Sequence, residues 1–299
     1  MGTTYKITIT STQIDSAKIH NSVDSILYSI NQEMSTYIDN STISRFNALD
    51  PGSELLIGED FHYVLKKSKY YNNISSGAFD VTIAPLVELW GFGASGSILS
   101  LPDSSSVMNA LKFLGLEKLN ISNNRVLSKN KEVTIDLSAI AKGLAVDKIS
   151  HFLTKNSFGN HMVEIGGEVR VSGYNKNKNK WKIGIQNPNI QDTTPLTTLL
   201  ISNKGIATSG NYRNYFDIEG KRYSHIISPV TGYPVENQIR GVTVISDNCL
   251  DSDALATALL VMDIDDGIKL IEDLKGFEVF YILESGEHTL SSGFMNFVP

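Results

Sequence analysis

The chain opens with a strand-like stretch and then changes to a helical pattern. Residues 1–9 alternate between polar and apolar side chains, as expected of a strand with one buried face. The first helix is predicted over residues 15–37 from apolar positions spaced three and four apart: Val23, Ile26, Ile30, Met34 and Tyr37. A second helix is predicted over residues 60–72.

A strand followed directly by a helix is predicted near the middle of the chain. Val133, Ile135 and Leu137 alternate with polar residues, which favours a strand. From Ser138 the apolar spacing becomes helical and includes Ile140 and Leu144. The pattern therefore predicts a strand-to-helix junction at residues 136–138.

The second half of the chain is rich in strand patterns. Six segments combine β-branched and aromatic residues with alternation: 163–165, 169–171, 181–185, 196–201, 223–227 and 242–245. After these segments the sequence predicts a helix over residues 252–262 and then a final helix and strand. Because no long linker interrupts these patterns, they predict one α+β domain over residues 1–299, with room for two lobes.

Composition and charge exclude several classes of protein. The 26 basic and 32 acidic residues give a net charge of 26 − 32 = −6, which argues against nucleic-acid binding. The single cysteine, Cys249, excludes an internal disulfide and a cysteine-based zinc cluster. No stretch reaches the roughly 20 apolar residues that cross a bilayer, so no transmembrane segment is predicted.

Asp253 and Thr257 are candidate metal ligands. Their spacing of four places both oxygen-bearing side chains on one face of the predicted helix. Carboxylate and hydroxyl oxygens are hard ligands of the kind Mg²⁺ selects. The alternative is a carboxylate near the helix N-terminus that is favoured by the macrodipole, with Thr257 only tolerated at the interface. Asp251 and Ser252 could serve as the helix cap, which would leave Asp253 free for another role.

Two further segments carry candidate chemistry. Residues 136–143 combine a helix start with Lys142, which suits an anionic ligand such as a phosphate. The alternative is an ordinary capped helix with Lys142 in solvent. His225 alternates with apolar neighbours, so a structural imidazole held by a backbone group and a catalytic base are both open.

Taken together, these segments resemble the ApbE family of magnesium-dependent flavin transferases (FAD:protein FMN transferases). Among the matching motifs are Asp136-Leu137-Ser138-Ala139-Ile140-Ala141-Lys142-Gly143 and Gly166-Gly167-Glu168. The resemblance covers nearly the whole chain, in one order, through residues 1–3, 34–37, 44–47, 77–82, 85–86, 89–93, 136–143, 166–168, 207–212, 225–232 and 253–257. Each motif alone is weak, but their shared order is specific.

The resemblance implies a set of site residues and a fold. Mg²⁺ would be held by Asp253, Thr257 and the backbone oxygens of Ala139 and Ala256. The catalytic residues would be His225, Asp253 and Lys142. The residues that line the FAD site would be Met1, Tyr37, Ala78, Phe79, Asp80, Asp136, Lys142 and Ile227. The implied fold is an α+β core of the tunnelling-fold (T-fold) type, with antiparallel strands and packed helices.

The implied reaction moves FMN from FAD to a threonine hydroxyl of a partner protein and releases AMP. The acceptors would be flavin-carrying subunits of ion-pumping redox complexes with a Ser/Thr-Gly-Ala-x-Thr segment. Two alternatives remain open: a Mg²⁺-dependent FAD pyrophosphatase, in which water replaces threonine, and an FAD-binding module without catalysis. A tyrosine at the position of Tyr37 resembles the branch of the family that transfers FMN rather than the branch that hydrolyses FAD.

One departure from the family bears on the mechanism, and one implication concerns location. Ser228 stands where family members usually have Asp, so a carboxylate that would support His225 or the following turn is absent. By resemblance the protein is expected in the periplasm or at the outer face of the cytoplasmic membrane, as a lipoprotein whose export segment has been removed.

Overall fold

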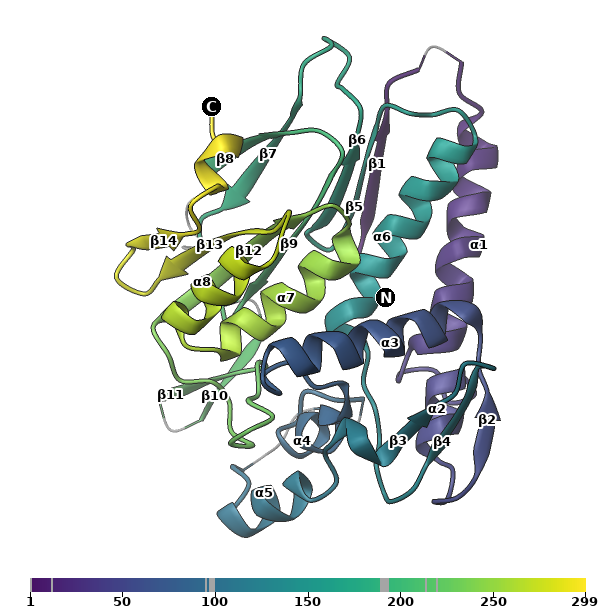
Figure 1. The fold of residues 1–299 in the computed structure, drawn as a ribbon, viewed down its shortest axis with the longest axis vertical. Coiled ribbons are helices and arrows are strands. Elements are labelled where there is room, and N and C mark those ends of the chain that lie inside the picture. Colours follow the sequence, from purple (N-terminus) through teal and green to yellow (C-terminus); the bar gives the residue numbers. More distant parts are fainter. Residues whose placement is uncertain are drawn as a thin grey trace. The chain divides into compact units, whose positions relative to one another are not determined.

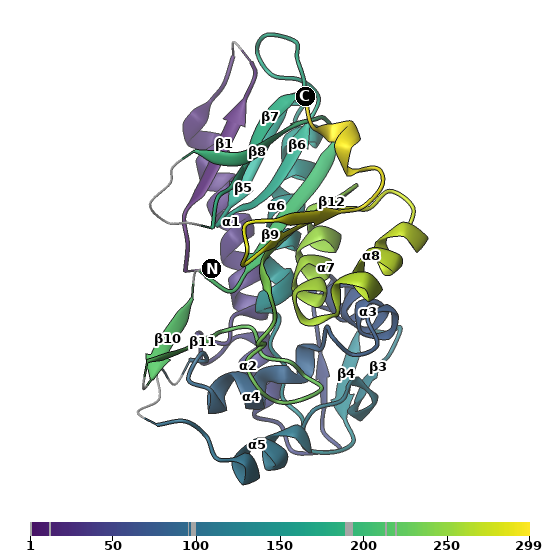
Figure 2. The same ribbon diagram turned by 90° about the vertical axis from the view of Figure 1, so that its left-hand side faces the viewer.

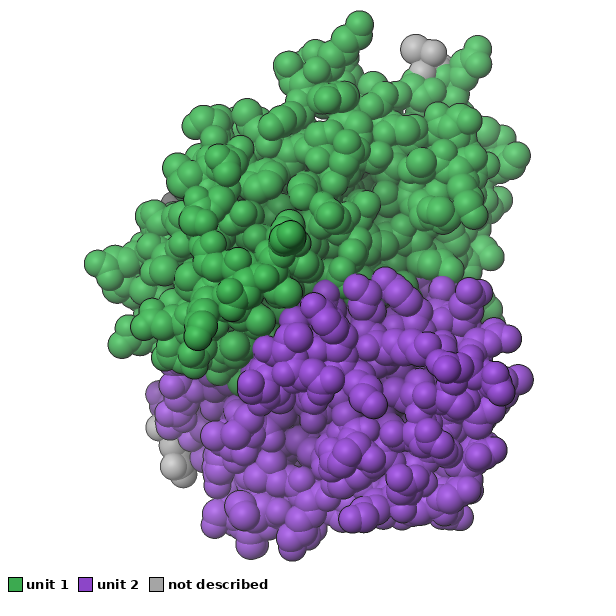
Figure 3. All heavy atoms as spheres, in the orientation of Figure 1, with its two compact units in different colours: residues 1–28, 142–212, 238–299 green, residues 29–141, 213–237 purple. Residues whose placement is uncertain are grey.

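The computed structural model describes residues 2–11, 13–94, 96, 100–188, 194–212, 214–218 and 220–299. This part of the chain forms two compact units (Figure 3). Unit 1 contains residues 1–28, 142–212 and 238–299, and unit 2 contains residues 29–141 and 213–237. Two of the boundaries between them fall inside the helices α1 (Ser16–Met34) and α6 (Ser138–Lys155).

The centre of unit 1 is an antiparallel sheet, which comprises seven strands in the described part of the chain (Figure 1). Each neighbouring pair in it is antiparallel. In spatial order the strands are β1 (Tyr5–Ile9), β5 (His161–Ile165), β6 (Glu168–Ser172), β9 (Lys204–Gly210), β12 (Ile239–Ser246), β13 (Glu278–Leu283) and β14 (His288–Leu290). Three segments distant in sequence therefore build one sheet.

A two-residue glycine turn joins β5 to β6 and sets the position of Glu168. Gly166 and Gly167 have φ values of 64° and 109°, a region that residues with a Cβ rarely adopt. The tight turn pairs Ile165 with Glu168 across the hairpin. Glu168 is consequently the first residue of β6.

Elements pack on both faces of this sheet. The helix α7 (Cys249–Val261) contacts β9 and β12 (Figure 2). The separate hairpin of β7 (Trp181–Gln186) and β8 (Pro195–Ile201) shares an apolar core with the sheet strands. Alternating sheet residues contribute to that core, among them Val169, Val171, Ile206, Ile245, Phe280 and Ile282.

The helix α7 is buried on nearly every side. Only Thr257 and Val261 among its residues fall outside the buried class, so the polar Asp251, Ser252 and Asp253 are buried together with its apolar residues. It begins at Cys249, three residues before the predicted start, and its N-cap is Asn248, whose side chain accepts the N–H of Asp251. The prediction of Asp251 or Ser252 as the cap is therefore wrong.

The remaining elements complete the two units. Unit 1 also contains α8 (Ile264–Asp273) and a short 3-10 helix, η3 (Phe294–Phe297). Unit 2 contains a small antiparallel sheet in the order β2-β4-β3, a hairpin of β10 and β11, and several helices. The helices and strands of unit 2 are, in chain order, α2 (Thr42–Asn47), β2 (Glu54–Leu56), α3 (Glu59–Ile74), η1 (Val81–Ile83), α4 (Ala84–Leu89), α5 (Ser104–Leu111), η2 (Leu116–Lys118), β3 (Leu119–Ile121), β4 (Val126–Lys129), β10 (Tyr215–Ile218) and β11 (Lys221–Ser224).

One predicted strand is absent. Val133, Ile135 and Leu137 are buried, as their alternation indicates, but residues 133–137 belong to no strand. The Asn47 side chain accepts the N–H of Ile135 at 2.8 Å and donates to its carbonyl at 2.9 Å. A side chain therefore satisfies backbone groups that a neighbouring strand would otherwise bond.

Most of the other predicted elements are confirmed, including the start of α6 at Ser138. The mixed α+β class with antiparallel sheets is confirmed. The strand predicted over residues 223–227 ends at Ser224. No helix within the described residues has the length and apolar character needed to cross a membrane.

Candidate active site

A buried charge cluster in unit 1 joins α6, α7 and the start of β6. The Lys142 ammonium lies 3.3 Å from Glu168 Oε1 and 3.5 Å from Asp253 Oδ1. Glu168 and Asp253 are buried, whereas the Lys142 side chain is 30% exposed. One cation thus serves two carboxylates and keeps a path to solvent.

The close approach of α6 to α7 depends on Gly143. A Cβ at this position would lie 2.6 Å from both Cys249 O and Leu250 Cα, closer than real Cβ contacts come. The Gly143 N–H donates to Asp253 Oδ2 at 2.9 Å. Each carboxylate oxygen of Asp253 therefore has a different partner on α6.

The electrostatics of this cluster favour an additional cation. Burial raises the pKa of Asp253 and that of Glu168, and Lys142 opposes both shifts. Burial lowers the pKa of Lys142, but Asp253 and Glu168 outweigh it and raise that pKa above its ordinary value. The cluster therefore carries excess negative charge when both carboxyl groups are ionised.

The residues of α7 also fit a magnesium ion. Thr257 lies one turn after Asp253, and its hydroxyl is 3.1 Å from Ser209 Oγ, with either atom as the donor. The Lys142 ammonium already supplies one cation to Asp253. Within the described residues, no group of three or more His, Cys, Asp or Glu side chains could hold a metal. A Mg²⁺ bound by Asp253 and Thr257 would keep its other positions for water or phosphate.

The structure contradicts one part of each alternative in which these residues have no special role. Asp253 is the fifth residue of α7 and lies beyond its first turn, where the acidic residue is Asp251. It is thus not the helix-end carboxylate of the alternative. Lys142 does not point into solvent, because its ammonium contacts two carboxylates.

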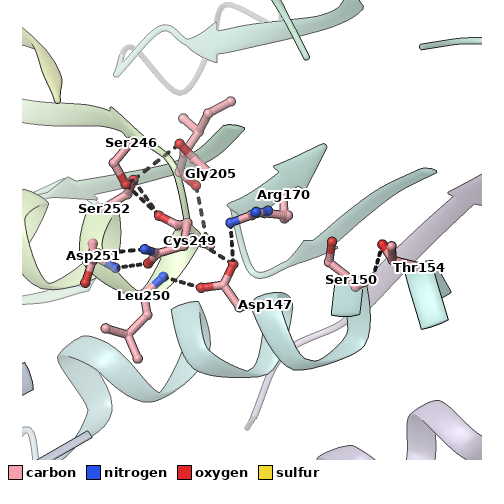
Figure 4. Close-up of polar contacts among 12 residues, drawn as sticks. Asp147, Ser150, Thr154, Arg170, Gly205, Ser246, Cys249, Leu250, Asp251 and Ser252 are labelled. Carbon is pink, nitrogen blue, oxygen red and sulfur yellow. Dashed lines mark hydrogen bonds and ion pairs between the residues drawn. The ribbon is translucent and has the colours of Figure 1, made fainter. Parts of the chain in front are cut away.

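The first turn of α7 is held by a second network, which sequence reasoning missed (Figure 4). Asp147 of α6 accepts the N–H groups of Cys249 and Leu250, both at 2.9 Å, and pairs with Arg170 at 3.1 Å. Glu168 and Ser209 were also not assigned roles. Glu168 and Ser209 had a signal, because they lie in the matched segments 166–168 and 207–212, whereas Asp147 had none.

In unit 2, Asp136 and Asp80 are capping residues. Asp136 Oδ1 accepts the N–H of Ser138 at 2.7 Å at the start of α6. Asp80 Oδ1 accepts the N–H of Thr82 at 2.7 Å and caps η1. Burial raises the pKa of Asp80, and its bonds to Thr82 oppose the shift. Both carboxylates thus stabilise local turns.

The other predicted residues of unit 2 differ in exposure. Ala78, Phe79 and Ile227 are buried. Tyr37 is 70% exposed and lies beyond the end of α1 at Met34, although the helix was predicted to extend to residue 37. An exposed ring of this kind is available to a ligand. Ala139 lies in α6, and Met1 lies outside the described residues.

His225 is oriented by a backbone carbonyl. Its Nδ1 lies 2.9 Å from Asn214 O, and because a carbonyl only accepts, Nδ1 carries the hydrogen. In the neutral ring Nε2 is then the acceptor nitrogen. The turn that follows is supported by Ser228, whose Oγ accepts the N–H of Thr231 at 3.2 Å. The carbonyl of Asn214 therefore orients His225, and the hydroxyl of Ser228 supports the following turn, the two roles expected of the absent carboxylate.

Comparison with known proteins identifies the family. The profile of the ApbE family matches residues 1–281. The chain belongs to the ApbE family. An ApbE relative from Vibrio cholerae, named FAD:protein FMN transferase, is 38% identical over 274 residues, which cover 91% of this chain and 82% of that protein. A relative of the same name from Haemophilus influenzae is 36% identical and covers 91% of this chain and 81% of its own.

Solved ApbE structures share the fold. The flavin transferase ApbE from Vibrio cholerae superposes with a TM-score of 0.91 at 36% identity, over 100% of this chain and 96% of that one. The ApbE protein from Thermotoga maritima gives a TM-score of 0.90 at 31% identity, with 100% and 96% coverage. The predicted ApbE membership is confirmed, while the residue assignments remain predictions.

Proposed function

We propose that this chain transfers FMN from FAD to a threonine hydroxyl of an acceptor protein in a Mg²⁺-dependent reaction and releases AMP. The flavin transferase activity follows from ApbE membership and from relatives of that name at 36–38% identity. The observation that carries the finer proposal is the ion pair between Lys142 and the buried Asp253, with Thr257 one turn further along α7.

The reaction is a phosphoryl-group transfer. The threonine Oγ forms a bond to the phosphorus of the FMN half, while the bond from that phosphorus to the AMP oxygen breaks. The AMP phosphate leaves with the electron pair, and the threonine proton passes to a base. Mg²⁺ held by Asp253, Thr257 and the carbonyls of Ala139 and Ala256 would neutralise charge on the pyrophosphate.

The chain's own residues supply the other functions. The Lys142 ammonium donates to phosphate oxygens and stabilises the charge that grows on them. Asp136 and the start of α6 lie four to six residues before Lys142, so the helix N-terminus adds its own attraction for an anion. We assign His225 Nε2 to activation of the threonine hydroxyl or to orientation of the phosphate.

The flavin and its acceptor are assigned on the same basis. Tyr37 contacts the isoalloxazine, with Met1, Ala78, Phe79, Asp80 and Ile227 lining the remaining FAD site. The acceptors are flavin-carrying subunits of ion-pumping redox complexes with a Ser/Thr-Gly-Ala-x-Thr segment. The proposal also includes a T-fold core and a periplasmic or outer-face location as a processed lipoprotein.

The test is a product balance. The purified chain is incubated with FAD and Mg²⁺, with and without an acceptor domain that carries the threonine segment. AMP, free FMN and flavin retained on the denatured acceptor are quantified. AMP equal to covalent flavin supports the proposal.

The matched control compares Asp253→Ala with Asp266→Ala, an exposed position of α8. The first should lose activity by at least about 100-fold, and the second should retain it. AMP matched by free FMN in the presence of acceptor would instead mean a pyrophosphatase. FAD binding without AMP would mean a binding module.

A further inference from the structure

The helix that carries Asp253 is tied to α6 by one carboxylate. Asp147 Oδ1 and Oδ2 each accept a backbone N–H from the first turn of α7, those of Cys249 and Leu250, at 2.9 Å (Figure 4). The Arg170 guanidinium lies 3.1 Å from Asp147 Oδ1. Cys249 and Leu250 are 102 and 103 residues beyond Asp147 in the sequence.

This contact is additional to the N-cap that Asn248 already provides. Asn248 Oδ1 already accepts the N–H of Asp251 at 2.9 Å, and Asn248 Nδ2 donates to Asp251 Oδ2 at 2.6 Å. A helix start leaves four N–H groups without helical partners, and Asn248 satisfies only one. Asp147 satisfies two more and at the same time joins α7 to another helix.

The same face of α6 reaches the metal-site carboxylate. Gly143 and Asp147 are four residues apart, so they lie one above the other on α6. The Gly143 N–H contacts Asp253, while Asp147 contacts the turn that precedes it. On the other side, a Cβ at Gly205 of β9 would lie 2.3 Å from Cys249 N, so the first turn of α7 cannot move any closer to β9.

We propose that Asp147 is a positioning residue for the metal site: through the first turn of α7 it sets Asp253 and Thr257 against Lys142. The inference rests on the magnesium role in the proposed function. Loss of the Asp147 contacts should let α7 move relative to α6 and weaken Mg²⁺ binding by about 10-fold, the scale typical of groups that orient metal ligands.

The experiment compares two capping carboxylates of unit 1. Asp263 accepts the N–H of Asp265 at 2.9 Å and caps α8, which bears no predicted site residue. Asp147→Ala and Asp263→Ala should both lower the unfolding midpoint of the full chain. Only Asp147→Ala should weaken Mg²⁺ binding in titration calorimetry and speed hydrogen exchange of the Gly143 amide.

A charge-balanced variant separates positioning from electrostatics. Asp147→Ala with Arg170→Gln has the net charge of the wild type but lacks the contacts to α7. Continued loss of Mg²⁺ affinity in this double variant supports positioning, and recovery to the wild-type value overturns it. If Asp147→Ala does not fold, Asp147→Asn, which keeps one acceptor oxygen, replaces it.

Two further results are decisive. Mg²⁺ affinity and Gly143 exchange that match the wild type in the Asp147 variants overturn the inference. A wild-type chain that binds no Mg²⁺ refutes the metal role in the proposed function instead. Exchange of the Gly143 amide still decides in that case, because it reports the Asp253 contact without metal.

Discussion

Replacement of Gly143 by alanine tests the packing on which the site depends. The added Cβ would lie 2.6 Å from Cys249 O and Leu250 Cα, whereas ordinary contact begins at 3.4 Å. The helices α6 and α7 must therefore separate by up to 3.4 − 2.6 = 0.8 Å. Both contacted atoms belong to the backbone, so no side-chain rotation relieves the overlap.

The expected loss of stability follows from two opposing effects. Overpacking of this kind costs about 1–3 kcal/mol, and alanine regains up to about 1 kcal/mol of helix propensity. With the full propensity gain, the net expectation is a loss of up to about 2 kcal/mol in the free energy of unfolding. The shift also lengthens the bond from the Gly143 N–H to Asp253, so transferase activity should fall as well.

Urea unfolding of the full chain, followed by far-UV circular dichroism, measures this change. The control is Gly159→Ala, because a Cβ at Gly159 meets no atom within 4 Å. The control should stay within about 0.5 kcal/mol of the wild type. If Gly143→Ala were as stable and active as the control, the close approach of α6 and α7 would not be required for the site.

Three further predictions concern charge, pH and product choice. Glu168→Gln should not lower the metal-free unfolding midpoint, because Lys142 and Asp253 then form a balanced pair; a clear decrease in thermal unfolding would contradict the shared-cation account. Burial lowers the pKa of His161, so the unfolded chain takes up a proton first as pH falls below about 6.5, and stability should decline there. Urea titrations of the wild type and His161→Gln check this, and equal pH dependence would refute it. Tyr37→Asn should shift products from covalent flavin towards free FMN without a change of more than about 0.5 kcal/mol in stability, since the ring is 70% exposed; an unchanged product ratio would count against Tyr37 as a flavin contact.

Local patterns predicted most helices and strands, because these elements depend largely on residues that are close together in the sequence. The start of α6 at Ser138 was predicted from a change in apolar spacing, and the structure shows it capped by Asp136. Residues 133–137 have the same alternation as a strand yet form none, since a side chain of α2 bonds Ile135. Alternation reports burial of one face, and hydrogen-bond partners come from elsewhere in the chain.

The sequence alone determined which residue types are available to the site and which of them share a helix face. Asp253 and Thr257 are one turn apart whatever surrounds them, and the ordered motifs were sufficient to predict the ApbE family. The tertiary structure decided that Glu168, 26 residues beyond Lys142, shares its ammonium with Asp253, and that Asp147 holds the first turn of α7. Side-chain contacts across such separations depend on how the sheet and helices pack, and no local spacing encodes them.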